Sequence, residues 1–397
     1  MNLNLLRWID EVFGPIVARL FFIIGLVVGR SRKLKSPLEY KTVEKVLIIK
    51  FFGGGSILLA SPAIYSIKKV HPSAHISIIT LSENREICSL LKAIDKIYYL
   101  DLKDPFSFFL KYFKLIQEIK NKNYDFIIDL EFVTNFSALT TLFISIVSKP
   151  CATIGFSSPS KWRNKIYSIA IPFDHSRHIT EIFAKLFFHL VEKPFKVDFK
   201  IPKKDIISLA ELSPLSKKIL DENSEANKII CVNINAGKIC LLRRWPQENY
   251  AELIVGLRDR FGIKTFLIGG KEDVSYVEDF IAKIPKKNDI FNLCGKLSIK
   301  ELVDLFNKSR LLITNDSGPL HIASIVGLPT ISFFGPETPY LYGPLGSDHH
   351  VFYEDIFCSP CINIYNAKAS NCNNNICLKS IGPETVMKKI EEKKFLS

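Results

Sequence analysis

From about residue 45 onward, short runs of apolar, β-branched residues alternate with longer segments of helical periodicity. The apolar runs form two series, which cover residues 46–49, 76–80, 97–100 and 126–130, then 229–234, 265–268, 311–314 and 330–334. Helices are expected over residues 56–70, 106–121, 319–326 and 383–394. Strands that are apolar throughout and separated by helices are typical of parallel sheets covered on both faces. The pattern therefore predicts an α/β protein with two such sheets.

The two series predict two domains. Residues 199–227 between them are polar and carry Pro202 and Pro214, as a linker would. A length of 397 residues agrees with two domains at roughly 100–200 residues each. We expect domains over residues 41–205 and 206–397. Their ligands are expected at the carboxyl ends of the strands, in a cleft between the domains.

Residues 1–40 form a predicted membrane-proximal segment. Residues 12–29 are apolar apart from Arg19, and a basic cluster follows at residues 30–35. The segment lacks the basic start and cleavage site of a secretory signal, and it is short for a span. A helix lying in the membrane interface, with the basic cluster on lipid phosphates, is the favoured interpretation. A true span and a docked soluble helix are the alternatives.

The charge supports a membrane partner. The chain has 53 Lys and Arg against 40 Asp and Glu, a net charge of +13. The first 50 residues hold nine basic and four acidic residues, so +5 of that charge lies there. This placement favours an anionic membrane surface over nucleic acid. A hydrophobic fraction of 47% and a charged fraction of 23% exclude a disordered or fibrous chain.

The strongest local motif follows the apolar run at 311–314. Asp316, Ser317 and Gly318 form a turn before a helix that begins near Pro319. The first turn of a helix has unpaired N–H groups, and glycine allows close approach, so this is a predicted phosphate site. Ser317 and His321 could also donate to an anion, whereas Asp316 would accept from sugar hydroxyls. Simple capping of the helix is the alternative.

Several motifs in order resemble one family. They are Val46 to Pro62, Ala236-Gly237 with Arg243-Arg244-Trp245-Pro246, Ile268-Gly269-Gly270 with Glu272-Asp273, Asn315 to His321, Gly327-Leu328-Pro329 and Phe334-Gly335-Pro336. Over about residues 45–390 the chain resembles glycosyltransferase family 9, the ADP-heptose:lipopolysaccharide heptosyltransferases. The resemblance implies a GT-B fold with two Rossmann-like domains. It also implies inverting, metal-independent transfer of heptose from ADP-heptose to a lipid-linked glycan, without a cofactor, at the cytoplasmic face of the inner membrane.

The resemblance also assigns donor-binding residues in the C-terminal domain. The set is Gly237, Arg243, Arg244, Asp273, Asp316, Ser317, Gly318 and His321. Asp316 would hold the heptose, and the amides of Ser317 and Gly318 would bind the diphosphate. Arg243, at the place of a family lysine, would neutralise phosphate charge. The adjacent Arg244 could take the same role. Asp273 would bind the ribose hydroxyls. A solvated basic face is the alternative for the two arginines, and packing is the favoured role of Trp245.

The N-terminal domain is assigned the acceptor, with Gly54, Gly55 and His178 as contacts. The family usually has Gly-Asp where this chain has Gly55-Ser56, and that Asp is taken as the base. A serine hydroxyl cannot act as a general base near neutral pH without a partner that takes its proton. Glu131 or Glu83 could serve instead, the acceptor could be easily deprotonated, or the protein could transfer poorly. Glu131 is favoured because it follows a strand.

Four cysteines cluster near the C-terminus as C-x2-C-x10-C-x4-C. They are Cys358, Cys361, Cys372 and Cys377. The central gap is shorter than in common zinc sites, so a structural metal, a disulfide staple and four free thiols all remain open. No catalytic role is expected for them.

Two other classes of protein fit the chain less well. An NAD-dependent oxidoreductase is disfavoured because Gly53-Gly54-Gly55 lacks the G-x-G-x-x-G spacing. A protein that binds ligands without catalysis is kept open by Ser56. A glycosyltransferase that uses another sugar or acceptor in surface-glycan assembly is the nearer alternative.

Overall fold

The computed structural model describes residues 43–190 and 229–396, apart from positions 103, 133, 149, 159–160, 238–239, 286, 288, 365 and 367–368. The chain divides into two compact units, Met1–Asp198 and Phe199–Ser397. The predicted linker and the N-terminal segment lie outside the described residues. The domain ranges 41–205 and 206–397 therefore stay a prediction, as does the membrane-proximal helix.

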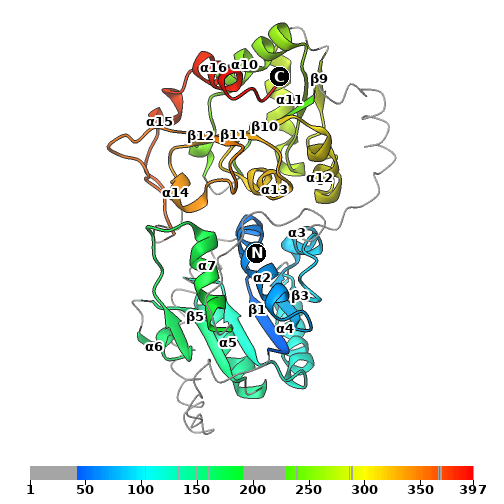
Figure 1. The fold of residues 1–397 in the computed structure, drawn as a ribbon, viewed down its shortest axis with the longest axis vertical. Helices are drawn as coiled ribbons and strands as arrows, with labels where there is room; N and C mark the ends of the chain where they lie inside the picture. The colour runs from blue at the N-terminus through cyan, green and yellow to red at the C-terminus, as the bar shows by residue number, and fades with distance from the viewer. Residues whose placement is uncertain are drawn as a thin grey trace. The chain divides into compact units, whose positions relative to one another are not determined.

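Unit 1 is a parallel six-stranded sheet covered by helices (Figure 1). The strands are β1 (Lys45–Ile49), β2 (His75–Leu81), β3 (Lys96–Leu100), β4 (Phe126–Asp129), β5 (Ala152–Phe156) and β6 (Ile169–Ile171), in the order β3-β2-β1-β4-β5-β6. The helices are α2 (Gly54–Val70), α3 (Arg85–Ser89), α4 (Pro105–Lys120), α5 (Asn135–Ser148), α6 (Lys161–Asn164) and α7 (Ile179–Phe187). Helix α2 packs against α7, and α4 packs against α5.

Unit 2 repeats this design. Its strands are β7 (Ile229–Asn233), β8 (Lys264–Leu267), β9 (Ile290–Asn292), β10 (Leu311–Asn315), β11 (Thr330–Phe334) and β12 (His349–Tyr353), in the order β12-β11-β10-β7-β8-β9. Its helices are α10 (Gln247–Phe261), α11 (Val274–Lys283), α12 (Ile299–Lys308), α13 (Gly318–Val326), α14 (Pro339–Tyr342), α15 (Ile376–Lys379) and α16 (Pro383–Glu392). Trp245, predicted to pack, is fully buried and stacks on Phe333 with ring centres 4.2 Å apart.

The eight predicted strands all form, with ends within about one residue of the prediction. Strands β5, β6, β9 and β12 were not predicted. β5 is fully buried, but Thr153 and Gly155 interrupt its apolar residues. β6 and β9 have three residues each and are only partly buried, and β12 begins with two histidines, so none shows a long apolar run. The helix expected from residue 56 begins at Gly54, so Gly54 and Gly55 belong to the helix and not to the loop. Gly53, with φ near 80°, makes the left-handed turn that admits this early start.

Both sheets have a point where the strand order reverses. In unit 1 this point lies between β1 and β4, and in unit 2 between β7 and β10. Successive crossovers leave in opposite directions there, which opens a crevice at the carboxyl ends of the two strands. Among the described residues, no helix is long and apolar enough to cross a membrane.

Candidate functional site

The turn between β10 and α13 is the predicted phosphate site, and Ser317 is the N-cap of α13. Its hydroxyl does not cap the helix. It accepts from Asn233 Nδ2 at 3.0 Å and lies 2.9 Å from Thr314 Oγ1. Capping, the simpler interpretation of Ser317, is therefore not what this side chain does. These contacts tie the turn to the end of β7, across the strand-order reversal.

Gly318 leaves the helix N-terminus open. A Cβ added there would meet no atom within 4 Å, so an anion could approach the backbone without obstruction. Helix α13 has nine residues, and its N-terminal amides carry partial positive charge. His321 lies one turn into the same helix and is buried. The turn has the backbone geometry of an anion site.

Asp316 and Arg243, both predicted to bind the donor, contact each other. Arg243 Nη1 donates to Asp316 Oδ2 at 3.0 Å and to the Asp316 carbonyl at 3.2 Å. The side chains are 11% and 7% exposed, so this ion pair is largely shielded from water. Arg243 also donates to the Ala236 carbonyl, beside Gly237, which has φ near 65°. Arg243 is therefore a fixed cation beside Asp316 and not part of a solvated basic face.

Arg244 and Asp273 form a second, looser pair. Arg244 Nη2 lies 3.9 Å from Asp273 Oδ1, and its guanidinium lies 3.9 Å from the centre of the Tyr276 ring. Asp273 Oδ2 accepts from the Gly270 amide at 3.0 Å. The aromatic face favours the cation and holds it in place. Both predicted residues are thus ordered at the carboxyl end of β8.

The fold brings the predicted donor residues to the carboxyl edge of one sheet, within unit 2. Sequence reasoning missed the amides that support them. Asn315 Oδ1 accepts from the Trp245 amide at 2.8 Å, and Asn315 Nδ2 donates to the Asn235 carbonyl at 3.1 Å. Asn233 is buried in the same network. The sequence clue was an asparagine at the end of each of two apolar strands, Asn233 in β7 and Asn315 in β10.

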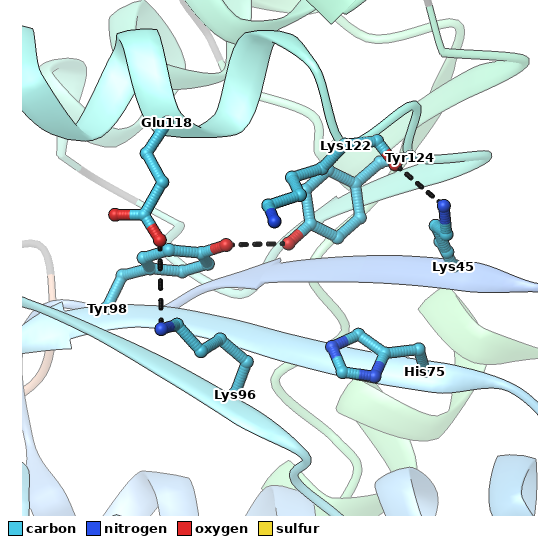
Figure 2. A pocket seen from close by; sticks show the side chains of 7 residues that line it. All are labelled: Lys45, His75, Lys96, Tyr98, Glu118, Lys122 and Tyr124. Carbon is cyan, nitrogen blue, oxygen red and sulfur yellow. Dashed lines mark hydrogen bonds and ion pairs between the residues drawn. The ribbon is translucent and has the colours of Figure 1, made fainter.

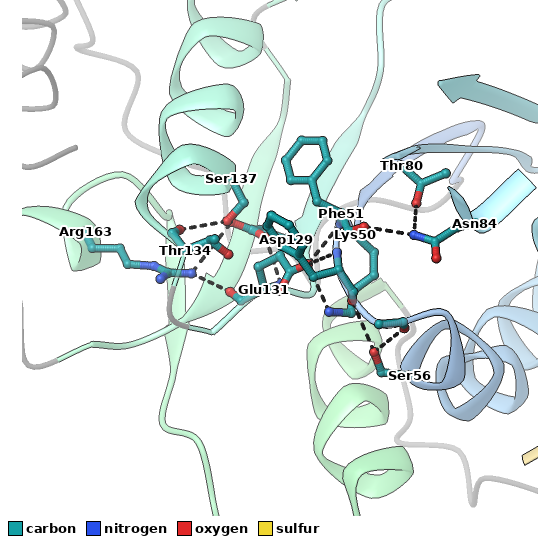
Figure 3. Close-up of polar contacts among 12 residues, drawn as sticks. Lys50, Phe51, Ser56, Thr80, Asn84, Asp129, Glu131, Thr134, Ser137 and Arg163 are labelled. Carbon is teal, nitrogen blue, oxygen red and sulfur yellow. Dashed lines mark hydrogen bonds and ion pairs between the residues drawn. The ribbon is translucent and has the colours of Figure 1, made fainter. Parts of the chain in front are cut away.

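The corresponding edge of unit 1 carries the glycine turn and Ser56 (Figure 3). The Ser56 hydroxyl donates to the Gly53 carbonyl at 2.7 Å. Among the described residues, the hydrogen-bond partners of this hydroxyl are the Gly53 and Phe52 carbonyls, which do not act as bases. Ser56 therefore closes the first turn of α2 in this structure.

Glu131 supports the backbone that leads into this turn. Its Oε1 accepts from the amides of Phe51 and Phe52 at 2.9 and 2.8 Å, and it lies 3.0 Å from Lys50 Nζ. The Lys50 and Glu131 side chains are 3% and 5% exposed. A base role for Glu131 would require that this buried pair open. The pairing of Glu131 with Lys50 was not predicted. The sequence clue was a lysine directly after an apolar strand, where a buried position needs a partner of opposite charge.

A second buried charge lies at the end of β4. Asp129 accepts from the hydroxyls of Tyr167 and Ser137 at 2.6 and 2.8 Å and lies 3.9 Å from Arg163. Arg163 also donates to the Glu131 carbonyl. Burial raises the pKa of Asp129 to about 6, although Arg163 and these hydrogen bonds act to lower it. This network, absent from the sequence prediction, holds the backbone of Glu131, whose amide donates to Asp129 and whose carbonyl accepts from Arg163.

The raised pKa predicts a pH-dependent stability. Between about pH 4 and 6, folded Asp129 keeps a proton that the unfolded chain has released, so its contribution falls as the pH rises. The free energy of unfolding of wild type relative to Asp129→Asn should fall by roughly 2 kcal/mol across that window and level off above about pH 7. Urea titrations at several pH values measure it. A difference that stays constant or rises would contradict the assignment.

The other predicted residues of unit 1 lie apart from this network. His178 is the N-cap of α7, and its Nδ1 accepts from the Thr180 amide at 3.3 Å. Gly54 is closely packed, because a Cβ there would lie 2.4 Å from Ile87 Cδ1 and the end of that side chain would have to shift. Glu83 is exposed in the turn after β2. Their predicted contacts with an acceptor stay predictions.

None of the four clustered cysteines forms a disulfide in the structure. Burial, together with the neighbouring thiols, raises the pKa of Cys377 to about 11. In the part of the chain that the structure describes, no group of three or more His, Cys, Asp or Glu has the arrangement of a metal site. A metal or disulfide staple stays a prediction.

A pocket of about 410 Å³ lies at the opposite edge of the unit 1 sheet (Figure 2). It is lined by Lys45, His75, Lys96, Tyr98, Glu118, Lys122 and Tyr124. Lys45 donates to the Lys122 carbonyl at 3.1 Å, and Lys96 lies 3.7 Å from Glu118. Because the strands are parallel, their amino ends are the edge away from the glycine turn. This pocket therefore does not extend the candidate site.

Comparison with known proteins agrees with this geometry. The model of glycosyltransferase family 9 (heptosyltransferase) matches residues 112–370. A lipooligosaccharide heptosyltransferase 2 of Campylobacter jejuni is 26% identical over 226 residues, which are 55% of this chain and 67% of that protein.

Two solved structures share the fold. A glycosyl transferase family 9 protein from Veillonella parvula has a TM-score of 0.70 and 21% identity, covering 90% of this chain and 98% of its own. The Escherichia coli ADP-heptose lps heptosyltransferase II has a TM-score of 0.65 and 18% identity, covering 88% and 98%. The two parallel six-stranded sheets are those of the GT-B fold. The chain belongs to glycosyltransferase family 9.

Proposed function

We propose that this glycosyltransferase transfers heptose from ADP-heptose, with inversion, to a lipid-linked glycan such as the lipopolysaccharide core. One observation carries the proposal. The buried pair of Arg243 and Asp316 lies beside the open N-terminus of α13, at the strand-order reversal of unit 2. A cation, unpaired backbone amides and a carboxylate together match a ligand with both phosphates and sugar hydroxyls.

The residues divide the donor between them. The diphosphate is bound by the amides of Ser317 and Gly318 and by the guanidinium of Arg243. His321 adds a hydrogen-bond donor to the phosphates. Asp316 accepts from hydroxyls of the heptose, and Arg243 offsets its repulsion of the phosphates. Asp273, kept ordered by Arg244, binds the ribose. As ADP leaves, the cation and the helix N-terminus stabilise the charge that develops on its β-phosphate.

The acceptor binds at unit 1, beside Gly54, Gly55 and His178. Its hydroxyl attacks the anomeric carbon on the face opposite the departing phosphate, which inverts that centre. The hydroxyl proton must pass to a base, and Ser56 holds the position that the family gives to one. Glu131 is the favoured replacement as base, and it could take the proton only if its ion pair with Lys50 opened.

Restoring the family's residue should raise turnover. Ser56→Asp places a carboxylate at the start of α2, where the helix N-terminus favours negative charge. We expect kcat to rise at least about tenfold, within the range that a positioned base contributes. Initial rates of transfer measure it, with Ser56→Asn as a control of similar size that cannot take a proton. Equal rates for the two variants would show that the base is elsewhere.

The enzyme acts peripherally at the cytoplasmic face of the inner membrane, where a lipid-linked acceptor presents its glycan. The basic cluster after residue 29 supports this location by its charge. No nucleic acid and no cofactor take part.

A panel of nucleotide sugars tests the proposal. Purified protein is incubated with ADP-heptose or other ADP-, UDP- and GDP-sugars, with and without truncated lipopolysaccharide, and product glycans are identified by mass. Transfer with ADP-heptose supports the proposal, and preference for another sugar would replace it. Binding without transfer would favour the second candidate, a non-catalytic binding protein, for which the Ser56 substitution is the specific observation.

A further inference from the structure

Helix α4 presents large apolar side chains to solvent. Phe109, Leu110 and Phe113 are 58%, 59% and 64% exposed. Phe113 lies four residues after Phe109 and three after Leu110, so both are its neighbours on the helix surface. An exposed cluster of this kind is costly in water, and on a soluble domain it marks a contact surface. We call Phe109, Leu110 and Phe113 the outer face of α4.

The opposite side of α4 already supplies the core. Phe108, Tyr112, Leu115, Ile116 and Ile119 are buried against the sheet of unit 1. The helix therefore does not need its outer face for folding. Since α4 is anchored by this inner side, its outer face is held in a fixed orientation.

The outer face is also fixed locally by aromatic contacts. The ring centres of Phe108 and Phe109 are 5.6 Å apart, and those of Tyr112 and Phe113 are 6.3 Å apart, both edge to face. Edge-to-face pairs of this kind are favourable. The exposed rings are thus presented as a preformed surface.

Basic residues accompany the apolar ones. Lys111, Lys114 and Lys120 of α4 are exposed. The only acidic residue within the helix, Glu118, lies 3.7 Å from Lys96 and is offset by it. Exposed aromatic and aliphatic groups, beside lysines that form no ion pair within the described part of the chain, are the composition of surfaces that bind anionic lipid.

The position of this face relates it to the acceptor side of the enzyme. Helix α4 follows β3, so its first turns lie near the carboxyl edge of the sheet, where the glycine turn lies. Phe108 packs on Phe136 with ring centres 5.7 Å apart, and Phe136 packs on Phe51 at 5.0 Å. A continuous aromatic cluster thus joins α4 to the strand end that leads into Ser56.

We propose that the outer face of α4 docks on an anionic lipid bilayer, with Phe109, Leu110 and Phe113 at the level of the headgroups and Lys111 and Lys114 on lipid phosphates. This surface is made of other residues than the predicted N-terminal membrane segment. The significance of the docking for catalysis rests on the proposed lipid-linked acceptor, since it would bring the carboxyl edge of unit 1 to the membrane. The binding itself requires no transfer activity.

A tryptophan at the contact gives a direct test in the full chain. Phe113→Trp is compared with Phe357→Trp, a control at a residue of unit 2 that is 96% exposed. Each variant is mixed with vesicles of phosphatidylglycerol and phosphatidylethanolamine, some with brominated acyl chains. The fluorescence of the native tryptophans is subtracted with the wild-type protein. Position 113 should shift to the blue and be quenched by bromine, and position 357 should not.

Substitutions then measure the contribution to affinity. Combined Phe109→Ser and Phe113→Ser should weaken vesicle binding on the order of tenfold, and Lys111→Gln with Lys114→Gln should weaken it comparably and reduce its salt dependence. Phe357→Ser is the control. Thermal unfolding checks that the variants fold.

Other occupants give different results. If the N-terminal segment covers α4, the fluorescence at position 113 is already blue-shifted in buffer and does not respond to vesicles. If a second copy covers it, the shift depends on protein concentration and the serine variants lower the oligomeric state. Either result overturns the proposal. Transfer to a detergent-solubilised acceptor should be unchanged in the serine variants, so a failure of docking and a failure of the proposed function are distinguishable.

Discussion

Replacing Asp316 with alanine is expected to weaken nucleotide-sugar binding about a hundredfold. The change removes the predicted acceptor for the sugar hydroxyls, and it also leaves the Arg243 guanidinium, 11% exposed, without its carboxylate. A hydrogen bond to a charged group contributes about 1.5–3 kcal/mol, which corresponds to a loss of affinity of roughly ten- to a hundredfold. The amides at the start of α13 and the Arg243 guanidinium remain, and the carboxylate that repels phosphate is gone, so binding of ADP itself should not weaken comparably.

Calorimetric titration with ADP-heptose and with ADP separates the two contributions. The loss should be larger for ADP-heptose, because only that ligand carries the sugar that Asp316 is proposed to hold. Glu384→Ala is the control, since Glu384 pairs with Arg260 in the same unit but is exposed. An Asp316→Ala variant that binds ADP-heptose as wild type does would refute the donor-site assignment.

Replacing Arg163 with methionine is expected to destabilise unit 1 by about 3–5 kcal/mol. Arg163 is 1% exposed, lies 3.9 Å from Asp129 and donates to the Glu131 carbonyl. Removing one member of a buried ionic network leaves the other charge uncompensated, which is why such changes are costly. Methionine keeps much of the volume of the side chain, so a cavity contributes little to the loss.

Chemical denaturation measures the free energy of unfolding of this variant. Arg177→Met is the matched control, because Arg177 pairs with Asp174 and Glu181 but is 59% exposed and should cost less than about 1 kcal/mol. Adding Asp129→Asn to Arg163→Met should recover part of the stability, since no charge is then left unpaired. Equal stabilities of Arg163→Met and Arg177→Met would show that the network contributes nothing.

The elements that the sequence predicted share one physical property. Strands such as β1, β7 and β10 are buried on both faces, so their residues form short, wholly apolar runs. Strand β12 is only partly buried and carries His349 and His350, so its pattern does not distinguish it from a loop. The prediction therefore followed continuous apolar runs. It missed the partly buried edge strand β12, and it also missed the buried inner strand β5, whose apolar residues are interrupted by Thr153 and Gly155.

The candidate site divides in the same way. The segment from Asp316 to Gly318 is contiguous, and its strand–turn–helix pattern identified it from the sequence. The contact of Asp316 with Arg243 joins residues 73 positions apart, and no local pattern encodes it. The buried pair of Lys50 and Glu131 was missed for this reason as well.

The sequence by itself determined that this protein has two α/β units, where most of their strands lie, and which turn offers unpaired amides to an anion. These properties depend on periodicity and on neighbouring residues. Only the tertiary structure decided the strand order, and with it the two reversals at which Arg243 meets Asp316 and Lys50 meets Glu131. It also decided which side of α4 is left exposed. Strand order and ion pairing are set by packing between distant segments, where burial strengthens each electrostatic contact that forms.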